Sequence, residues 1–135
     1  MPLKIYIASK ISHGEKLFKW STTHNMQIHT FTSNWYRPPF KGMSEDPGFA
    51  KMFWEMDIYD VKLCDILLLY AEPEDNLRGA LVEVGVALSD KKAVLIVGEN
   101  DGHGTWQHHR GVFKVKDLEE AERFLAGFRY IQWQE

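Results

Sequence analysis

The stretch Cys64-Asp65-Ile66-Leu67-Leu68-Leu69-Tyr70-Ala71 is the segment of this chain that says most about its fold. It is a short apolar run with a helical pattern on each side, which is typical of a central parallel strand buried on both faces. In sheets of such strands, ligands bind beyond the carboxyl ends of the strands. We therefore expect a functional site at the acidic loop 72–76, which follows this run, and on the helix after it.

Strand and helix patterns alternate along the rest of the chain. Further strands are expected at residues 3–8, 26–32, 93–98 and 112–115. Helices are expected to end near residue 20 and to span residues 47–63, 77–90 and 117–128, with Asp46 and Asp117 as N-caps of the second and the last. This order predicts a single domain over residues 1–135, with an α/β, doubly wound, flavodoxin-like sheet of about five parallel strands flanked by helices.

The composition narrows the class of protein. A chain of 135 residues with 44% hydrophobic residues can bury a core as one domain. The net charge of −3 argues against polymeric nucleic acid as a partner, because that partner requires a basic surface. No apolar run approaches the roughly 20 residues that span a bilayer, and no signal peptide precedes the first strand, so we expect a cytoplasmic protein without membrane contact. The single cysteine, Cys64, is expected in the core.

The helices on either side of the central run are apolar on two faces. In the helix at residues 47–63, one face carries Phe49, Met52, Phe53, Met56, Tyr59 and Leu63, and the other carries Ala50, Trp54, Asp57 and Val61. A helix that is apolar on two sides needs two neighbours, so we expect it to pack on its own sheet and on something else. On the helix at residues 77–90, Glu83 lies at the border of the two faces. Its small neighbours Gly79 and Ala87 are expected to leave space beside the carboxylate.

The search for chemistry leaves carboxylates as the main candidates. No Walker pattern and no G-x-G-x-x-G motif occurs, so no cofactor is expected. His103, His108 and His109 lack an acidic partner at metal-ligand spacing, so no metal site is expected. The carboxylates near the sheet are Asp57, Asp60, Asp65, Asp75 and Glu83, of which Asp65 is expected to tether the start of the strand. Paired carboxylates can cleave an acetal-like C–O or C–N bond through an oxocarbenium-like state.

Three segments together resemble a known family. They are Tyr6-Ile7-Ala8-Ser9 on the first strand, Asp57 placed eight residues before Asp65, and the helix Gly79-x-x-x-Glu83-x-Gly85-x-Ala87. This pattern is similar to that of the nucleoside 2-deoxyribosyltransferases and the related 2′-deoxynucleoside 5′-phosphate N-hydrolases. The resemblance extends from the first strand to the fourth.

The resemblance implies roles for individual residues. Glu83 would be the nucleophile at C1′ of a 2-deoxyribosyl group, Asp57 would handle the proton of the base, with Asp60 as its rival, and Tyr6 would orient the nucleophile. Asp75 or Asn76 would bind sugar hydroxyls or the base, and Gly79 would line the site. The turn Ser9-Lys10 also offers backbone N–H groups that suit an anion or sugar hydroxyls.

The same resemblance implies a homodimer or larger homo-oligomer, in which a neighbouring subunit completes the site with the loop that carries Trp106, His108 and His109. The N-hydrolases have a hydroxyl residue for the 5′-phosphate where this chain has Leu77, so Lys10, Arg78 or Arg110 are candidates instead. In the loop at residues 33–46, Trp35, Tyr36 and Arg37 could stack on a flat ligand or anchor the loop to the core.

Two functions remain open from the sequence. The first is an enzyme, transferase or hydrolase, that cleaves or transfers the N-glycosidic bond of a 2′-deoxynucleoside or deoxynucleoside monophosphate. The second is a non-catalytic nucleotide-binding or regulatory protein of the same fold. Either one takes a small nucleoside or nucleotide as its ligand.

Overall fold

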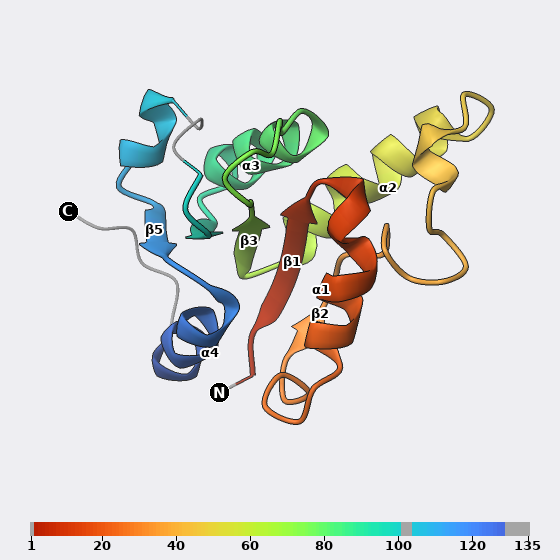
Figure 1. Ribbon diagram of the computed structural model, residues 1–135. Coiled ribbons are helices and arrows are strands. Elements are labelled where there is room, and N and C mark those ends of the chain that lie inside the picture. Colours follow the sequence, from red (N-terminus) through yellow and green to blue (C-terminus); the bar gives the residue numbers. More distant parts are fainter. Residues whose placement is uncertain (1, 101–103, 129–135) are drawn as a thin grey trace.

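The computed structural model describes residues 2–100 and 104–128, and within them five parallel strands form one sheet (Figure 1). The strands are β1 (Lys4–Ser9), β2 (Thr30–Phe31), β3 (Ile66–Tyr70), β4 (Ala93–Val97) and β5 (Val112–Val115). Their order in the sheet is β2-β1-β3-β4-β5, and every neighbouring pair is parallel. This is the flavodoxin-like order, so the predicted fold class is confirmed.

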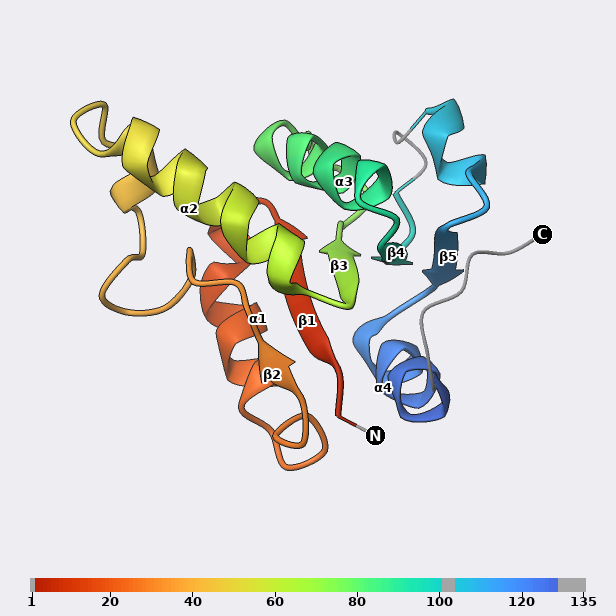
Figure 2. The same ribbon diagram turned by 180° about the vertical axis from the view of Figure 1, so that it is seen from behind.

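Helices cover both faces of the sheet. The helices α1 (Gly14–Ser21) and α4 (Leu118–Gly127) lie on one face, and α2 (Ala50–Leu63) and α3 (Gly79–Ser89) lie on the other (Figures 1 and 2). Three short 3-10 helices occur in the connections: η1 (Ile11–His13), η2 (Met43–Glu45) and η3 (Thr105–His108). Because β1 and β3 are neighbours, the chain reverses its winding direction between them, which is where such folds bind ligands.

The core lies at the two strands that the sequence shows as apolar runs. Every residue of β3 and β4 is buried, and so is Cys64, as predicted. Asp65 lies at the amino end of β3, where its Oδ2 accepts a hydrogen bond from the backbone N–H of Lys4 at 2.9 Å. The predicted tether at the start of the strand is therefore confirmed, and it lies at the opposite end of the sheet from the expected site.

Two element boundaries differ from the sequence prediction because local turns replace regular structure. The strand expected at residues 26–32 is limited to β2, since Met26 and Gln27 donate backbone hydrogen bonds to the carbonyl of Thr23. The helix expected from residue 47 begins at Ala50. Asp46 does not cap it, because its Oδ1 accepts the N–H of Gly48 at 2.8 Å in a tight turn.

The helix α3 also starts later than expected, whereas the N-cap of α4 is the predicted residue. The helix begins at Gly79 rather than at residue 77. Asp117 accepts a hydrogen bond from the N–H of Glu120 at 2.8 Å and so caps α4.

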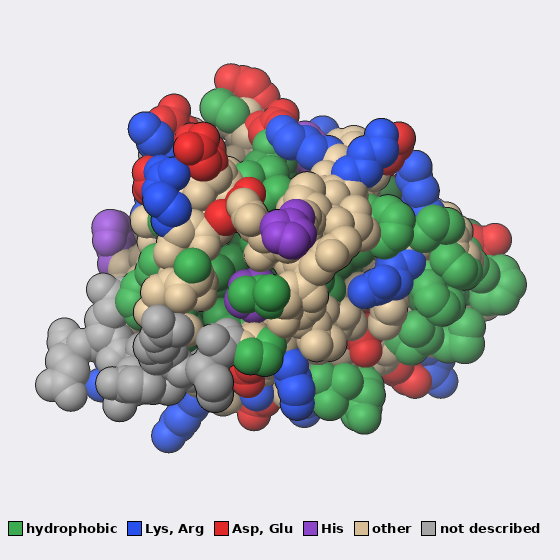
Figure 3. Space-filling view, turned by 90° about the horizontal axis from the view of Figure 1, so that it is seen from below, with side chains coloured by type: hydrophobic (Ala, Val, Ile, Leu, Met, Phe, Trp, Pro, Cys, Tyr) green, Lys and Arg blue, Asp and Glu red, His purple; other side chains and the backbone are tan. Residues whose placement is uncertain are grey.

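One of the two apolar faces of α2, the face that carries Met52, is largely exposed in the single chain. Its exposed side chains are Met52 (51% exposed), Tyr59 (62%) and Leu63 (43%), together with Phe49 (43%) just before the helix, whereas Phe53 on the same face is buried. In Figure 3, hydrophobic side chains gather on the side of the molecule that holds α2 and the segment before it. Among the described residues, no helix has both the length and the apolar character required to cross a membrane.

Candidate active site

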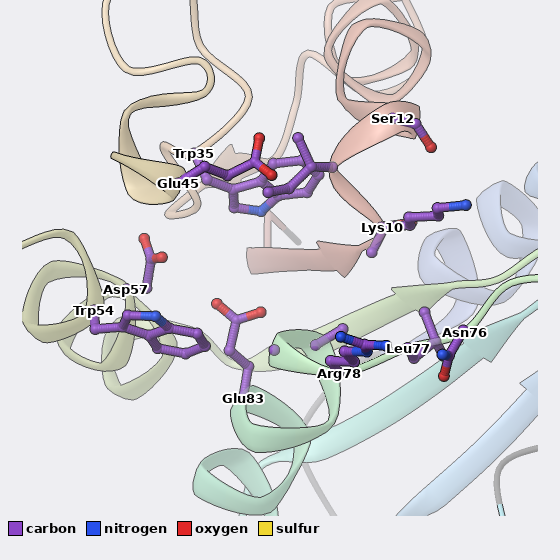
Figure 4. A pocket seen from close by; sticks show the side chains of 14 residues that line it. Lys10, Ser12, Trp35, Glu45, Trp54, Asp57, Asn76, Leu77, Arg78 and Glu83 are labelled. Atoms are coloured by element: carbon purple, nitrogen blue, oxygen red, sulfur yellow. The ribbon is translucent and has the colours of Figure 1, made fainter. Parts of the chain in front are cut away.

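A cavity of about 600 Å³ opens beyond the carboxyl ends of β1 and β3 (Figure 4). It is lined by the turn after β1, the loop after β3, and the facing sides of α2 and α3. This is the position expected for a ligand site in a doubly wound sheet. Four of the residues predicted from the sequence to bind substrate line it: Ser9, Lys10, Asn76 and Gly79.

Glu83 reaches this cavity from α3. The residue is only 6% exposed, and Figure 4 shows its carboxylate directed into the cavity. The hydroxyl of Tyr6, which is fully buried on β1, donates a hydrogen bond to Oε2 of Glu83. Tyr6 is thus both a core residue and a partner of the carboxylate, because its ring packs in the core while its hydroxyl reaches α3.

Asp57 reaches the same cavity from α2. It is 6% exposed and lines the cavity together with Glu83. Asp60, one helical turn later, is equally buried but does not line the cavity. Its Oδ2 accepts a hydrogen bond from Nδ2 of Asn34 at 3.1 Å. Of the two aspartates that the sequence left open, Asp57 is therefore the one beside Glu83.

Burial changes the proton affinity of both carboxyls in the cavity. It raises the pKa of Asp57 to about 7, and the nearby charge of Asp60 adds to this effect. It also raises the pKa of Glu83, with the hydrogen bond from Tyr6 opposing the rise and the charges of Asp57 and Asp60 supporting it. Burial also raises the pKa of the Tyr6 hydroxyl, so Tyr6 remains a hydrogen-bond donor. The pair can therefore hold a proton near neutral pH.

Two tryptophans form walls of the cavity. Trp35 is fixed by a hydrogen bond from its Nε1 to the carbonyl of Ile7 at 2.7 Å, and the neighbouring Tyr36 is buried with its hydroxyl on Ser33. The loop at residues 33–46 is therefore anchored to the core by its aromatic residues, which is one of the two interpretations that the sequence left open. Trp35 also lines the cavity.

Trp54, which the sequence analysis did not assign to the site, lies against Gly79. A Cβ atom at Gly79 would be 2.9 Å from the Trp54 ring, so any larger residue there would require the ring to shift. The space expected beside Glu83 is thus partly filled by an indole. The sequence pattern that could have placed Trp54 in the site is its spacing: it lies three residues before Asp57 and so shares the same face of the helix.

Positive charge gathers at another part of the cavity. Lys10 and Arg78 both line it, on the far side of Glu83 from Asp57 in Figure 4. Neither forms a hydrogen-bonded ion pair within the part of the chain that the structure describes. Arg110, the third cation considered from the sequence, does not line the cavity.

Asp75 does not line this cavity, and its contact with substrate stays a prediction. Its Oδ2 accepts the backbone N–H of Glu72 at 2.8 Å and lies 2.8 Å from Nε2 of His13. A carboxylate in a tight loop is readily satisfied by nearby donors. Asp75 therefore holds the loop after β3 against η1, and the next residue, Asn76, faces the cavity instead.

Trp106 and His109 lie near β5 and do not line the cavity of their own chain. Trp106 packs partly against the core, and Nδ1 of His109 accepts the N–H of Gly111 at 2.9 Å. Their contact with a ligand of a neighbouring subunit stays a prediction. His103 falls outside the described residues, and those residues contain no cluster of three side chains suited to a metal ion.

Comparison with known proteins finds likeness in structure only. No protein-family model and no curated protein sequence matches the chain significantly. A CMP N-glycosidase of Clostridium botulinum superposes with a TM-score of 0.60 at 14% identity, covering 93% of this chain and 99% of that one. A 2-deoxyribosyltransferase of Bacillus psychrosaccharolyticus superposes with a TM-score of 0.69 at 15% identity, covering 97% of each chain. This chain therefore shares its fold with both proteins.

Proposed function

We propose that this protein cleaves or transfers the N-glycosidic bond of a 2′-deoxynucleoside or deoxynucleoside monophosphate. The observation that carries the proposal is the placement of two buried carboxyls, Glu83 and Asp57, in one cavity, with the Tyr6 hydroxyl bound to Glu83. Two carboxyls of different proton affinity are what a double displacement at an anomeric carbon requires. The reaction class of both structural neighbours, an N-glycosidase and a deoxyribosyltransferase, supports it.

In the first step, an oxygen of the Glu83 carboxylate attacks C1′ and the C1′–N bond breaks. The electron pair of that bond goes to the base nitrogen, which takes a proton from Asp57. The product is a glycosyl ester of Glu83 and a free base. In the second step, water or an acceptor base gives its proton to Asp57 and attacks C1′, which releases Glu83.

The lining of the cavity suggests how a substrate would lie. With C1′ at Glu83, a flat base would lie toward Trp35, Trp54 and Asp57, where aromatic rings can stack on it. The 5′ end of the sugar would then point toward Lys10 and Arg78.

The test is incubation of the purified protein with deoxynucleosides and their 5′-monophosphates, with and without an acceptor base, followed by chromatography for free base. Free base with water alone indicates a hydrolase, and base exchange only with an acceptor indicates a transferase. Glu83→Gln should lower kcat by several orders of magnitude, since it removes the nucleophile. Glu74→Gln, in the loop before α3 and outside the cavity, is the matched control. Saturable binding without any product would contradict the proposal and support a non-catalytic nucleotide-binding protein.

A further inference from the structure

Asp60 is a buried carboxyl that the proposed reaction does not use. It lies three residues after Asp57 on α2, so both side chains project from the same side of the helix. Asp60 is 7% exposed, yet it does not line the cavity. A carboxylate buried without a cation is unfavourable, and its position next to the site therefore requires a reason.

The segment after β2 holds Asp60 in place by both its side chain and its backbone. Nδ2 of Asn34 donates to Oδ2 of Asp60 at 3.1 Å, and Oγ1 of Thr32 donates to the backbone carbonyl of Asp60 at 2.9 Å. A hydrogen bond from an amide to a carboxylate favours the charged form of that carboxylate. Burial raises the pKa of Asp60, and the hydrogen bond from Asn34 opposes that rise.

The surroundings of the two aspartates contain no compensating cation among the described residues. Arg37, in the same segment as Asn34, donates instead to the carbonyls of Ser33 and Phe31. The titratable groups that act on the two aspartates or feel their charge are Glu83 on α3 and Tyr6 on β1. The other charged residues that line the cavity exert no resolved effect on either aspartate: Lys10, Glu45 and Arg78.

Three neighbouring carboxyls cannot all be ionised in such a place, so the cluster keeps a proton. Hydrogen bonds distinguish the three carboxyls. The hydroxyl of Tyr6 donates to Glu83 and the amide of Asn34 donates to Asp60, so the anion is favoured at both. Among the described residues no group donates a hydrogen bond to the Asp57 carboxyl, and the nearby charge of Asp60 raises its pKa. This arrangement favours the proton on Asp57 and the charge on Glu83.

We propose that Asp60 is a positioning residue, which, as an ion held by Asn34, keeps the shared proton on Asp57 and leaves Glu83 as the anion. This inference rests on the proposed function, in which the base nitrogen takes that proton as the C1′–N bond breaks. Asp60 itself touches neither the substrate nor the reacting atoms. It acts only through the proton of Asp57.

The direct test is NMR of the aspartate carboxyl carbons as a function of pH, with the Asp57 signal identified by its loss in Asp57→Asn. In the wild type, the pKa of Asp57 should be about 7. In Asp60→Asn, the midpoint of Asp57 should fall by about half a pH unit or more, because a nearby like charge has been removed. Glu55→Gln removes a charge from the exposed side of the same helix and should leave the Asp57 midpoint unchanged.

A second variant keeps the test informative if Asp60→Asn does not fold. Asn34→Ala leaves Asp60 in place but removes its hydrogen bond, so the midpoint of Asp60 should rise and that of Asp57 should fall. In the pH profile of kcat/KM, the alkaline limb reports loss of the proton from Asp57. In both variants that limb should move to lower pH, an effect that a purely structural role of Asp60 would not produce.

The two proposals fail in different ways. An Asp57 midpoint that is the same in Asp60→Asn, Glu55→Gln and the wild type would overturn the role of Asp60, whether or not the protein is active. Absence of free base from every deoxynucleoside and deoxynucleotide would overturn the proposed function, while the NMR titration would still decide where the proton resides.

Discussion

The hydroxyl of Tyr6 on β1 donates a hydrogen bond to the carboxylate of Glu83 on α3, across 77 positions of sequence. The contact joins the first strand to the helix that follows the third strand, so it forms only when β1 and β3 are neighbours in the sheet. It fixes the direction of the Glu83 carboxylate within a cavity that it shares with Asp57. The assembly of the sheet therefore places the proposed nucleophile.

Removal of that hydroxyl should weaken the nucleophile. In Tyr6→Phe the ring remains in the core, whereas the hydrogen bond that lowers the pKa of Glu83 is lost. A hydrogen bond to a charged group contributes about 1.5–3 kcal/mol, so kcat/KM at neutral pH should fall roughly 10-fold to 100-fold. The acid limb of the pH profile should move to higher pH. An acid limb at the wild-type position would show that Tyr6 has only a core role.

The raised pKa of Asp57 should also make the native state less stable at alkaline pH. The folded-state pKa lies above the value of a free carboxyl, so the native state holds more protons than the unfolded state between about pH 4 and 7. The free energy of unfolding should therefore decrease as the pH rises through this window. Asp57→Asn should remove part of the decrease and stabilise the protein by a few kcal/mol near pH 9, with little effect near pH 4. Urea unfolding at both pH values measures this, and equal effects at both would contradict it.

The two cations of the cavity should favour a substrate with a 5′-phosphate. Lys10→Ala and Arg78→Ala should each raise KM for a deoxynucleoside 5′-monophosphate about tenfold or more, with little change for the unphosphorylated nucleoside. Arg123→Ala removes an exposed cation from α4, outside the cavity, and serves as the control. An equal rise in KM for the monophosphate and for the nucleoside would mean that the two cations do not contact a phosphate.

The exposed apolar face of α2 should be buried between subunits. We expect a homodimer or larger homo-oligomer by light scattering, since exposed apolar patches mark interaction surfaces. Met52→Glu and Tyr59→Glu should shift the protein toward the monomer, because a charge in an apolar interface is unfavourable. Glu55→Lys, on the polar side of the same helix, should leave the mass unchanged. A monomeric wild type at micromolar concentration would refute this expectation.

Much of the fold follows from hydrophobic patterning. The two apolar runs that form β3 and β4 are buried along their whole length. Because helical patterns separate them in the sequence, a parallel sheet can be predicted. The positions of Glu83 and Asp57 on helices beside one end of the sheet also followed from the sequence. Their placement in one cavity depends on the crossing of α2 and α3, which no local pattern specifies.

The differences come from polar residues whose partners are set by local turns or by distant segments. Asp46 has the residue type expected of a cap, yet its carboxylate accepts the backbone N–H of Gly48 two residues later. Asp75 likewise accepts the N–H of Glu72 and does not line the cavity. Trp54 was missed because its role depends on contact with Gly79 across two helices. Burial of Asp60 could not be inferred either, since Asn34 reaches it from a segment without regular structure.

The most direct test of the central claim is a search for a covalent sugar on Glu83. A 2′-fluorinated deoxynucleoside or its 5′-monophosphate, which slows release of the glycosyl ester, would be incubated with the protein, and the peptides of the acid-quenched sample analysed by mass spectrometry. We predict one added glycosyl group on the peptide that contains Glu83, and none in Glu83→Gln. Release of base by the wild type without an adduct, together with full activity of Glu83→Gln, would contradict the account.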